Sequence, residues 1–231
     1  LFASDRSGKW QIWEVPAEGG VARRVRTNEA IEYQVDESPD GGTLAFLSNE
    51  SGQPNSPLVA AAPESLLLVP RAGGAARVLV RHGANTIMGN PDWSPDGKQI
   101  TFSSNWRVGH QIYVADAGTG EARRISPLHR GGCEPRFSPD GGRVIYVDRG
   151  HLGETSLLTE IDLLSGARKT IVDWPALNYD PAYSPDGTEI AFASNITGEY
   201  AIYRQRLSDG KSWRVTQGKG DARYPDYRPD R

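Results

Sequence analysis

The stretch Asn90-Pro91-Asp92-Trp93-Ser94-Pro95-Asp96-Gly97 recurs along the 231-residue chain and decides its fold. In most copies an aromatic residue precedes the Ser-Pro-Asp-Gly turn, and a short apolar run follows it. The turns begin at Ser38, Ser94, Ser138, Ser184 and, in a degenerate copy, Arg228. The intervals between these positions are 56, 44, 46 and 44 residues. Repeats of this length are typical of the blades of a β-propeller.

Each repeat is expected to form four antiparallel strands. In the best copy, β-branched and aromatic runs lie at 99–103, 111–114 and 123–125, separated by Pro, Asp and Gly. Within the turn, the serine side chain accepts a backbone hydrogen bond, proline presets φ, and glycine takes the positive φ that follows. The turn therefore predicts a hairpin between the first and second strands of each blade.

The fourth strand of each repeat alternates basic with apolar residues, as in Arg23-Arg24-Val25 and Arg123-Arg124-Ile125. A basic stripe can bind nucleic acid. Here, however, the pairs would be spread around a ring, and the net charge of the chain is −3. Charged residues on exposed edge strands prevent edge-to-edge association. We therefore expect no nucleic-acid partner.

The two ends of the chain are in phase with the repeat. Residues 1–13 align without a gap on 191–203, so the chain begins within a second strand. Residues 225–229 would then supply the first strand of the same blade and pair with Leu1–Ser4. This arrangement predicts one all-β domain of five blades, with part of a six-bladed ring as the alternative. The approximate bounds of the blades are 1–30 with 224–231, 31–88, 89–132, 133–178 and 179–223.

An aromatic residue recurs in the second strand of every repeat. We expect these side chains to be buried between blades, because aromatic residues dominate the packing of such cores. They are Phe2, Phe46, Phe102, Tyr146 and Phe192.

The Pro-x-aromatic-Ser-Pro-Asp-Gly pattern resembles that of the TolB-like propellers, which are built from WD40-like (PD40) repeats. The resemblance covers Pro91–Gly97, Pro135–Gly141 and Pro181–Gly187, and more weakly 35–41 and 225–230. It implies a binding platform. TolB is a periplasmic adaptor that contacts a lipoprotein and other envelope proteins, so the resemblance implies a periplasmic or extracellular location. Similar repeats form sensor domains and the non-catalytic propellers of prolyl-oligopeptidase-type peptidases.

Motifs for catalysis are missing from the sequence. There is no Gly-x-Ser-x-Gly nucleophile elbow, no phosphate-binding glycine loop and no His-Glu-x-x-His pair. The chain has no apolar run long enough to span a membrane. Its single cysteine, Cys133, excludes an internal disulfide and is expected to be buried as a small apolar residue. The histidines are expected to lie in separate solvated loops; they are His82, His110, His129 and His151.

The residue four positions before each turn is expected at the mouth of the central tunnel, where the first strand of each blade enters. We call these five residues the mouth ring: Gln34, Asn90, Glu134, Asp180 and Tyr224. The oxygen atoms of the first four could hold a hard cation such as Ca²⁺. The alternative is a hydrated polar pore with no cofactor.

Loops at the same face carry aromatic and basic side chains of the kinds that interface centres favour. The candidate partner-binding residues are His82, Trp106, Arg107, His129, Arg130, Trp174, Tyr179 and Tyr224. Trp174 could instead cover a blade junction. The enlarged loop Asn49–Glu64, with an apolar segment between prolines, is also expected here and favours a cap or a partner contact.

Two functions from different classes follow from these observations. The first is a non-catalytic protein- or peptide-binding propeller that uses the loop face. The second is a metal-dependent lactonase or polysaccharide lyase with Glu134 and Asp180 at the tunnel mouth. The ring residues vary in type and no histidine cluster accompanies them, which favours the first. The oligomeric state is left open.

Overall fold

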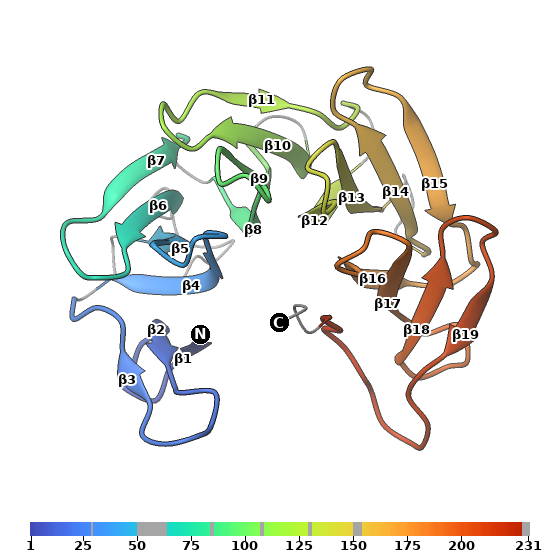
Figure 1. Cartoon of the computed structure of the whole chain (residues 1–231), viewed down its shortest axis with the longest axis horizontal. Helices are drawn as coiled ribbons and strands as arrows, with labels where there is room; N and C mark the ends of the chain where they lie inside the picture. Colours follow the sequence, from blue (N-terminus) through green and yellow to red (C-terminus); the bar gives the residue numbers. More distant parts are fainter. Residues whose placement is uncertain are drawn as a thin grey trace.

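The computed structural model describes residues 1–28, 30–49, 64–83, 86–106, 109–128, 131–149 and 154–227. All regular structure in these residues is β-strand, arranged in five antiparallel sheets that we call blades 1 to 5 (Figure 1).

Blade 1 comprises β1 (Phe2–Ser4), β2 (Gln11–Glu14) and β3 (Arg23–Arg24). Blade 2 comprises β4 (Ile31–Glu37), β5 (Thr43–Asn49), β6 (Glu64–Pro70) and β7 (Arg77–Arg81). Blade 3 comprises β8 (Met88–Trp93), β9 (Gln99–Ser104), β10 (Gln111–Asp116) and β11 (Ala122–Arg124). Blade 4 comprises β12 (Gly132–Phe137), β13 (Arg143–Asp148), β14 (Leu157–Asp162) and β15 (Arg168–Val172). Blade 5 comprises β16 (Asn178–Tyr183), β17 (Glu189–Ser194), β18 (Ala201–Arg206) and β19 (Ser212–Arg214).

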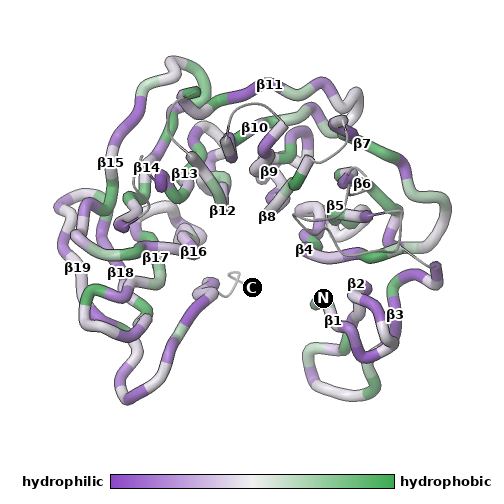
Figure 2. Tube along the Cα trace, turned by 180° about the vertical axis from the view of Figure 1, so that it is seen from behind, coloured by the Kyte–Doolittle hydropathy of each residue, from purple (hydrophilic) through white to green (hydrophobic). Residues whose placement is uncertain are grey.

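The blades stand side by side around a common centre. Their first strands β4, β8, β12 and β16 line that centre, and their last strands lie at the rim (Figure 1). Part of the rim strand β11, which contains Arg123 and Arg124, is hydrophilic (Figure 2), and both residues of β3 are exposed. The basic residues therefore lie on outer strands, as predicted. None of the described residues forms a helix that could cross a membrane.

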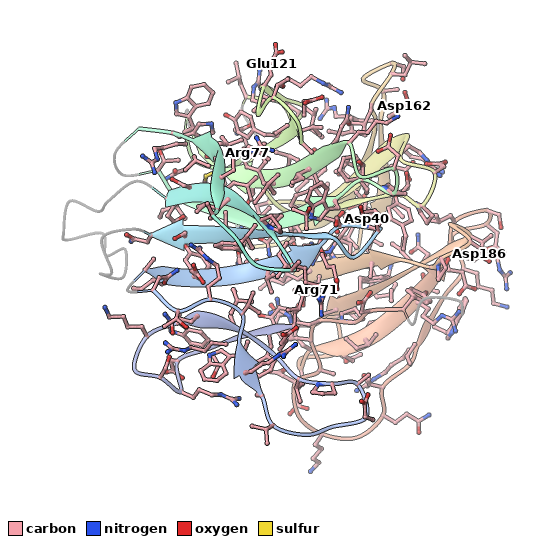
Figure 3. All side chains as sticks on the ribbon, turned by 60° about the vertical axis from the view of Figure 1, so that its left-hand side comes forward. Asp40, Arg71, Arg77, Glu121, Asp162 and Asp186 are labelled. Carbon is pink, nitrogen blue, oxygen red and sulfur yellow. The ribbon has the colours of Figure 1, made fainter. Side chains whose placement is uncertain are left out.

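The Ser-Pro-Asp-Gly turns form as their chemistry predicts. In blade 5, Ser184 donates its hydroxyl to Asp186 Oδ1 at 2.6 Å, and the Glu189 N–H donates to Ser184 Oγ at 2.9 Å. Gly187 takes a φ of +67°, and its N–H donates to the carbonyl of Ser184. The same bonds recur at the turns that begin at Ser38, Ser94 and Ser138. Asp40 and Asp186 mark two of these turns on one side of the molecule in Figure 3.

One apolar cluster fills each of the four junctions between consecutive blades. The second-strand aromatic residue of a blade faces the blade before it: Phe102 packs with Leu66 and Leu68 of blade 2. Phe46, Phe102, Tyr146 and Phe192 are all fully buried, which confirms the prediction for these four. Phe2 is only half-buried. No blade precedes it in the described chain, and the Arg6 guanidinium lies 4.9 Å from its ring centroid instead.

The described residues do not form the predicted closing pair between 225–229 and Leu1–Ser4. β1 pairs only with β2, so blade 1 has three strands, and residues 225–227 lie in no strand. Residues 228–231 lie outside the described part of the chain. The reason is that the C-terminal segment packs on blade 5: the Arg204 guanidinium lies 5.6 Å from the Tyr227 ring centroid. The arc is therefore open between blades 5 and 1 (Figure 1).

Candidate functional site

All five residues of the mouth ring have a left-handed backbone conformation. Their φ angles lie between +50° and +57°, and no other non-glycine residue among those described has a positive φ. Each such residue costs on the order of 1 kcal/mol and persists only where its surroundings fix it. The left-handed residues therefore form a repeated, strained feature at the centre of the blades.

A β-bulge produces this conformation in blades 2 to 5. The pairing register between first and second strands shifts between Gly89 and Asp92 in blade 3, and at the equivalent places in the others. The two residues inside the shift are a mouth-ring residue and, in blades 3 to 5, a proline such as Pro91. A bulged residue has no ladder partner, so proline, which lacks an N–H, fits there without losing a hydrogen bond.

Side chains of the mouth ring link one blade to the next. Gln34 Oε1 accepts a hydrogen bond from the Asn90 N–H at 2.8 Å, and Glu134 Oε2 accepts one from the Asp180 N–H at 2.7 Å. Asp180 Oδ2 accepts one from the Tyr224 N–H at 3.2 Å. Three of the four oxygen donors predicted for a cation thus already accept backbone hydrogen bonds.

The carboxylates two residues further along the strand form a second layer of the same kind. Asp36 Oδ2 accepts from the Trp93 N–H at 2.8 Å, and Asp92 Oδ2 accepts from the Phe137 N–H at 2.7 Å. Both layers line a cavity of about 510 Å³, which Arg136 and Asp226 also line. This second layer was not among the predicted site residues, although its members lie at a fixed offset of two residues from the mouth ring.

Burial changes the titration of this cavity. Asp92, whose side chain is 20% exposed, has its pKa raised to about 7, chiefly by burial and secondarily by the charge of Asp36. Burial also raises the pKa values of Asp36 and Glu134. The Arg136 guanidinium, with Nη1 3.9 Å from Asp92 Oδ1, opposes the rise at Asp92. The cavity therefore holds one carboxylate, Asp92, that takes up a proton near neutral pH, beside two others whose pKa values burial also raises.

Replacing Asp92 with asparagine should flatten the pH dependence of stability. A folded pKa above the unfolded value means that the folded state binds the proton more tightly, so stability falls as pH rises from about 4 to about 7. The asparagine would keep an acceptor for the Phe137 N–H without the charge. We expect the substitution to raise the free energy of unfolding by roughly 2 kcal/mol at pH 8 and to change it little at pH 4. Urea titrations at both pH values measure this.

Asp173→Asn is the control, because Asp173 is exposed. It should leave the pH profile of stability unchanged. If Asp92→Asn kept the profile of the parent chain, the assignment of the raised pKa to Asp92 would be wrong.

Arg223 holds the C-terminal segment against the mouth. Its Nε and Nη2 donate to Asp180 at 2.5 and 3.2 Å. Its guanidinium carbon lies 4.6 Å from the Tyr200 ring centroid, 5.0 Å from that of Tyr179 and 5.2 Å from that of Tyr224. Tyr179 is therefore part of an aromatic cage around Arg223, whereas Tyr224 remains 78% exposed. Nothing in the sequence pattern identified Arg223, because its role depends on Tyr179 of β16 and on Tyr200 in the loop before β18.

Trp106 presents an aromatic surface in the loop after β9. It is 44% exposed and stacks on His82, with ring centroids 4.1 Å apart and planes 18° apart. His82 is buried, contacts Ser104 Oγ through Nδ1 at 3.1 Å, and has its pKa lowered to about 4 by desolvation. His82 is therefore neutral at ordinary pH and supports the ring of Trp106. The prediction that His82 is a solvated loop residue is wrong, because its side chain is buried.

Trp174 belongs to the core of blades 4 and 5. Its ring lies edge-on to Phe192 at 5.1 Å and to Tyr203 at 5.0 Å. This packing agrees with the interpretation that Trp174 covers a blade junction, which leaves less of its ring for a partner. Arg107, His129, Arg130 and most of the loop Asn49–Glu64 lie outside the described residues.

Across the part of the chain that the structure describes, no three His, Cys, Asp or Glu side chains are grouped as a metal site. Of the predicted cation ligands, Asn90, Glu134 and Asp180 line the central cavity, and Gln34 contacts it through the Asn90 N–H. A cation there stays a prediction. Cys133 lies at the same level and is partly buried. Burial raises the pKa of its thiol to about 12, which disfavours a reactive thiolate.

Comparisons with known proteins agree with this architecture. Residues 133–231 match the family described as TolB beta propeller domain (PD40). The chain is 26% identical over 196 aligned residues to the uncharacterized peptidase YuxL of Bacillus subtilis, and this match covers 69% of the chain. It is 28% identical over 148 aligned residues to dipeptidyl-peptidase 5 of Porphyromonas gingivalis, and this match covers 58% of the chain. The crystal structure of TolB from Acinetobacter baumannii superposes with a TM-score of 0.74 at 22% identity, over 92% of this chain.

The similarity covers only part of each of these proteins. The chain accounts for 29% of YuxL, 21% of dipeptidyl-peptidase 5 and 50% of the TolB chain. Its relatives thus include propellers of TolB type and propeller regions of peptidases.

Proposed function

Because the chain is a TolB-like β-propeller domain built from PD40 repeats, we propose that it is a non-catalytic module that binds a protein or peptide at the tunnel mouth. The observation that carries the proposal is the mouth ring itself. Five non-glycine residues at the same position of the repeat have a positive φ, and four of them, Asn90, Glu134, Asp180 and Tyr224, line the central cavity. Local strain of this kind clusters at binding sites. A periplasmic or extracellular location is part of this proposal, and the likeness to TolB supports it.

The geometry of the mouth suits an extended segment. The cavity of about 510 Å³ below the ring offers carboxylates, one guanidinium and left-handed backbone at its rim. Tyr224 stands exposed on the ring, and Trp106 stands exposed on a loop of blade 3. Exposed aromatic side chains beside a polar opening are typical of interface centres. The partner would thus anchor apolar side chains on Tyr224 and Trp106 and place polar groups over the opening.

Loss of both exposed aromatic side chains should abolish partner binding without unfolding the domain. Peptides selected from a phage-displayed random library on the immobilised chain supply the probe. We expect a Trp106→Ala, Tyr224→Ala double variant to bind these peptides at least about 30-fold more weakly, since a central aromatic is worth about 2 kcal/mol or more. Titration calorimetry measures the affinity, and circular dichroism checks the fold.

Leu164→Ala is the matched control. Leu164 is 98% exposed in the turn between β14 and β15, at the opposite end of the blades from the mouth ring. This variant should bind like the parent chain. Unchanged affinity in the double variant, together with loss in Leu164→Ala, would move the binding site to the other face and overturn the proposal.

A further inference from the structure

A second cavity, of about 580 Å³, lies between blades 2 and 3 at the end that carries the Ser-Pro-Asp-Gly turns. Its apolar wall consists of Leu68, Pro70 and Trp93. Arg77 and Lys98 bring positive charge to its edge. The volume is in the range that small ligands occupy. We call this cavity the blade 2/3 cleft; it is separate from the tunnel mouth.

Arg77 is held in place without a counter-ion. It extends from β7 (Figure 3) across to blade 3, where its Nη2 donates to the Ala117 carbonyl at 2.6 Å and its Nη1 donates to the Gly118 carbonyl at 3.1 Å. Carbonyl groups orient the guanidinium but leave its charge uncompensated. Among the residues that the structure describes, no carboxylate pairs with Arg77.

The nearby carboxylate of Asp116 is committed to its own turn. Asp116 Oδ1 accepts hydrogen bonds from the Gly118 N–H at 2.9 Å and the Thr119 N–H at 2.7 Å. These bonds lower the pKa of Asp116. Asp116 therefore lines the cleft as a carboxylate bound to backbone donors, and Arg77 has no counter-ion within the described part of the chain.

The equivalent cleft between blades 4 and 5 contains the carboxylate that the blade 2/3 cleft lacks. Leu68 pairs with Arg77 across β6 and β7 as Glu160 pairs with Lys169 across β14 and β15. Glu160 and Lys169 line a cavity of about 500 Å³ at this second position. There Glu160 Oε2 accepts hydrogen bonds from the Tyr183 hydroxyl at 2.6 Å and from Arg143 Nη1 at 3.3 Å.

In the blade 2/3 cleft, each of these acceptor contacts is missing. Leu68 stands in place of Glu160, and Trp93 stands in place of Tyr183. Trp93 is only 8% exposed, and its indole Nε1–H has no hydrogen-bond acceptor among the described residues. The cleft thus has a cation and a buried donor beside an apolar wall, but it has no carboxylate at the position of Glu160.

We propose that the blade 2/3 cleft binds the free C-terminal residue of a peptide with a large apolar side chain. The α-carboxylate pairs with Arg77, and the side chain lies on Leu68, Pro70 and Trp93. A carboxylate and an apolar group on one residue match a guanidinium that directly adjoins an apolar wall. The ligand supplies the charge that Glu160 supplies between blades 4 and 5. This site is independent of the tunnel mouth.

Three short probes separate the sources of the carboxylate: N-acetyl-Ala-Phe as the free acid, the same dipeptide as its amide, and N-acetyl-Asp-Phe amide. Binding is followed by ¹⁵N–¹H NMR at the amides of Gly97 and Gly118, which line the cleft. We expect the free acid to bind saturably and both amides to bind at least about tenfold more weakly, as loss of a charge-assisted contact predicts. Equal binding of the free acid and its amide would overturn the proposal, and stronger binding of the aspartyl peptide would overturn the assignment to a C-terminus.

Variants of the cleft test the role of Arg77. Arg77→Gln should weaken the free acid about tenfold or more, whereas Lys169→Gln, at the same position of the other cleft, should leave its affinity unchanged. Leu68→Glu should remove binding altogether, because it restores an internal carboxylate like Glu160. A thermal melt of each variant reports the fold. Parental affinity in Arg77→Gln, or retained affinity in folded Leu68→Glu, would refute the proposal.

Discussion

Phe102→Ala should lower the free energy of unfolding by about 3 to 5 kcal/mol, the range for an aromatic side chain removed from a packed core. Phe102 has no exposed surface. Its ring stacks on Tyr113 with centroids 5.5 Å apart and packs in the apolar cluster between blades 2 and 3. The cavity would lie inside a blade junction, where neighbouring strands cannot collapse freely. Urea titration followed by circular dichroism measures the loss.

Phe2→Ala is the control at the same repeat position. Phe2 occupies the second-strand site of blade 1, but it is half-buried. Its strand β1 borders the open side of the arc (Figure 1). Its truncation should cost about 1 kcal/mol, because only part of the apolar surface is lost to solvent. Equal losses in the two variants would mean that a blade covers Phe2 in solution.

Gly120→Ala should destabilise the domain by about 2 to 5 kcal/mol. Gly120 has a φ of +77° in the turn between β10 and β11, and an added Cβ would lie 2.2 Å from the backbone carbonyl oxygen of Leu79 in blade 2. The substitution combines left-handed strain of about 1 to 2 kcal/mol with overpacking of about 1 to 3 kcal/mol. The clash is with main chain, so no side-chain rotation can relieve it. The same urea titration measures the effect.

Gly166→Ala separates the two contributions. Gly166 lies in the corresponding turn of blade 4 with a φ of +71°, and nothing lies within 4 Å of its added Cβ. Alanine there should cost only about 1 to 2 kcal/mol, from the backbone strain alone. If both variants lost the same free energy, blade 3 would not approach blade 2 as closely as the 2.2 Å separation indicates.

Local chemistry made the turns and the mouth ring predictable. Ser184, Asp186 and Gly187 satisfy one another within five residues, so the hairpin needs no distant partner. The mouth ring follows because each of its residues stands at a fixed offset from such a turn. The spacing of the turns therefore predicted the five blades and the residues at their centre, but not the pairing at the two ends of the chain.

Contacts between segments far apart in the chain could not be predicted from the sequence. Trp174 is a loop residue by position, and only the packing of Phe192 and Tyr203 shows that it belongs to the core. The role of Arg223 depends on Asp180, 43 positions away. The pairing expected for 225–229 was inferred from phase alone, and phase does not reveal that Tyr227 packs against Arg204 of blade 5.

The links of the mouth ring also bear on how such a chain can grow. In each link, one blade supplies a side-chain acceptor and the next supplies a main-chain N–H, as between Glu134 and Asp180. Every residue except proline has that N–H, so the acceptor does not depend on the identity of its neighbour. A duplicated or exchanged repeat could therefore join the series without a compensating substitution in the repeat that follows. Evolution by copying whole blades, and the assembly of new chains from existing ones, would be restricted by the packing at the junctions more than by the polar links at the centre.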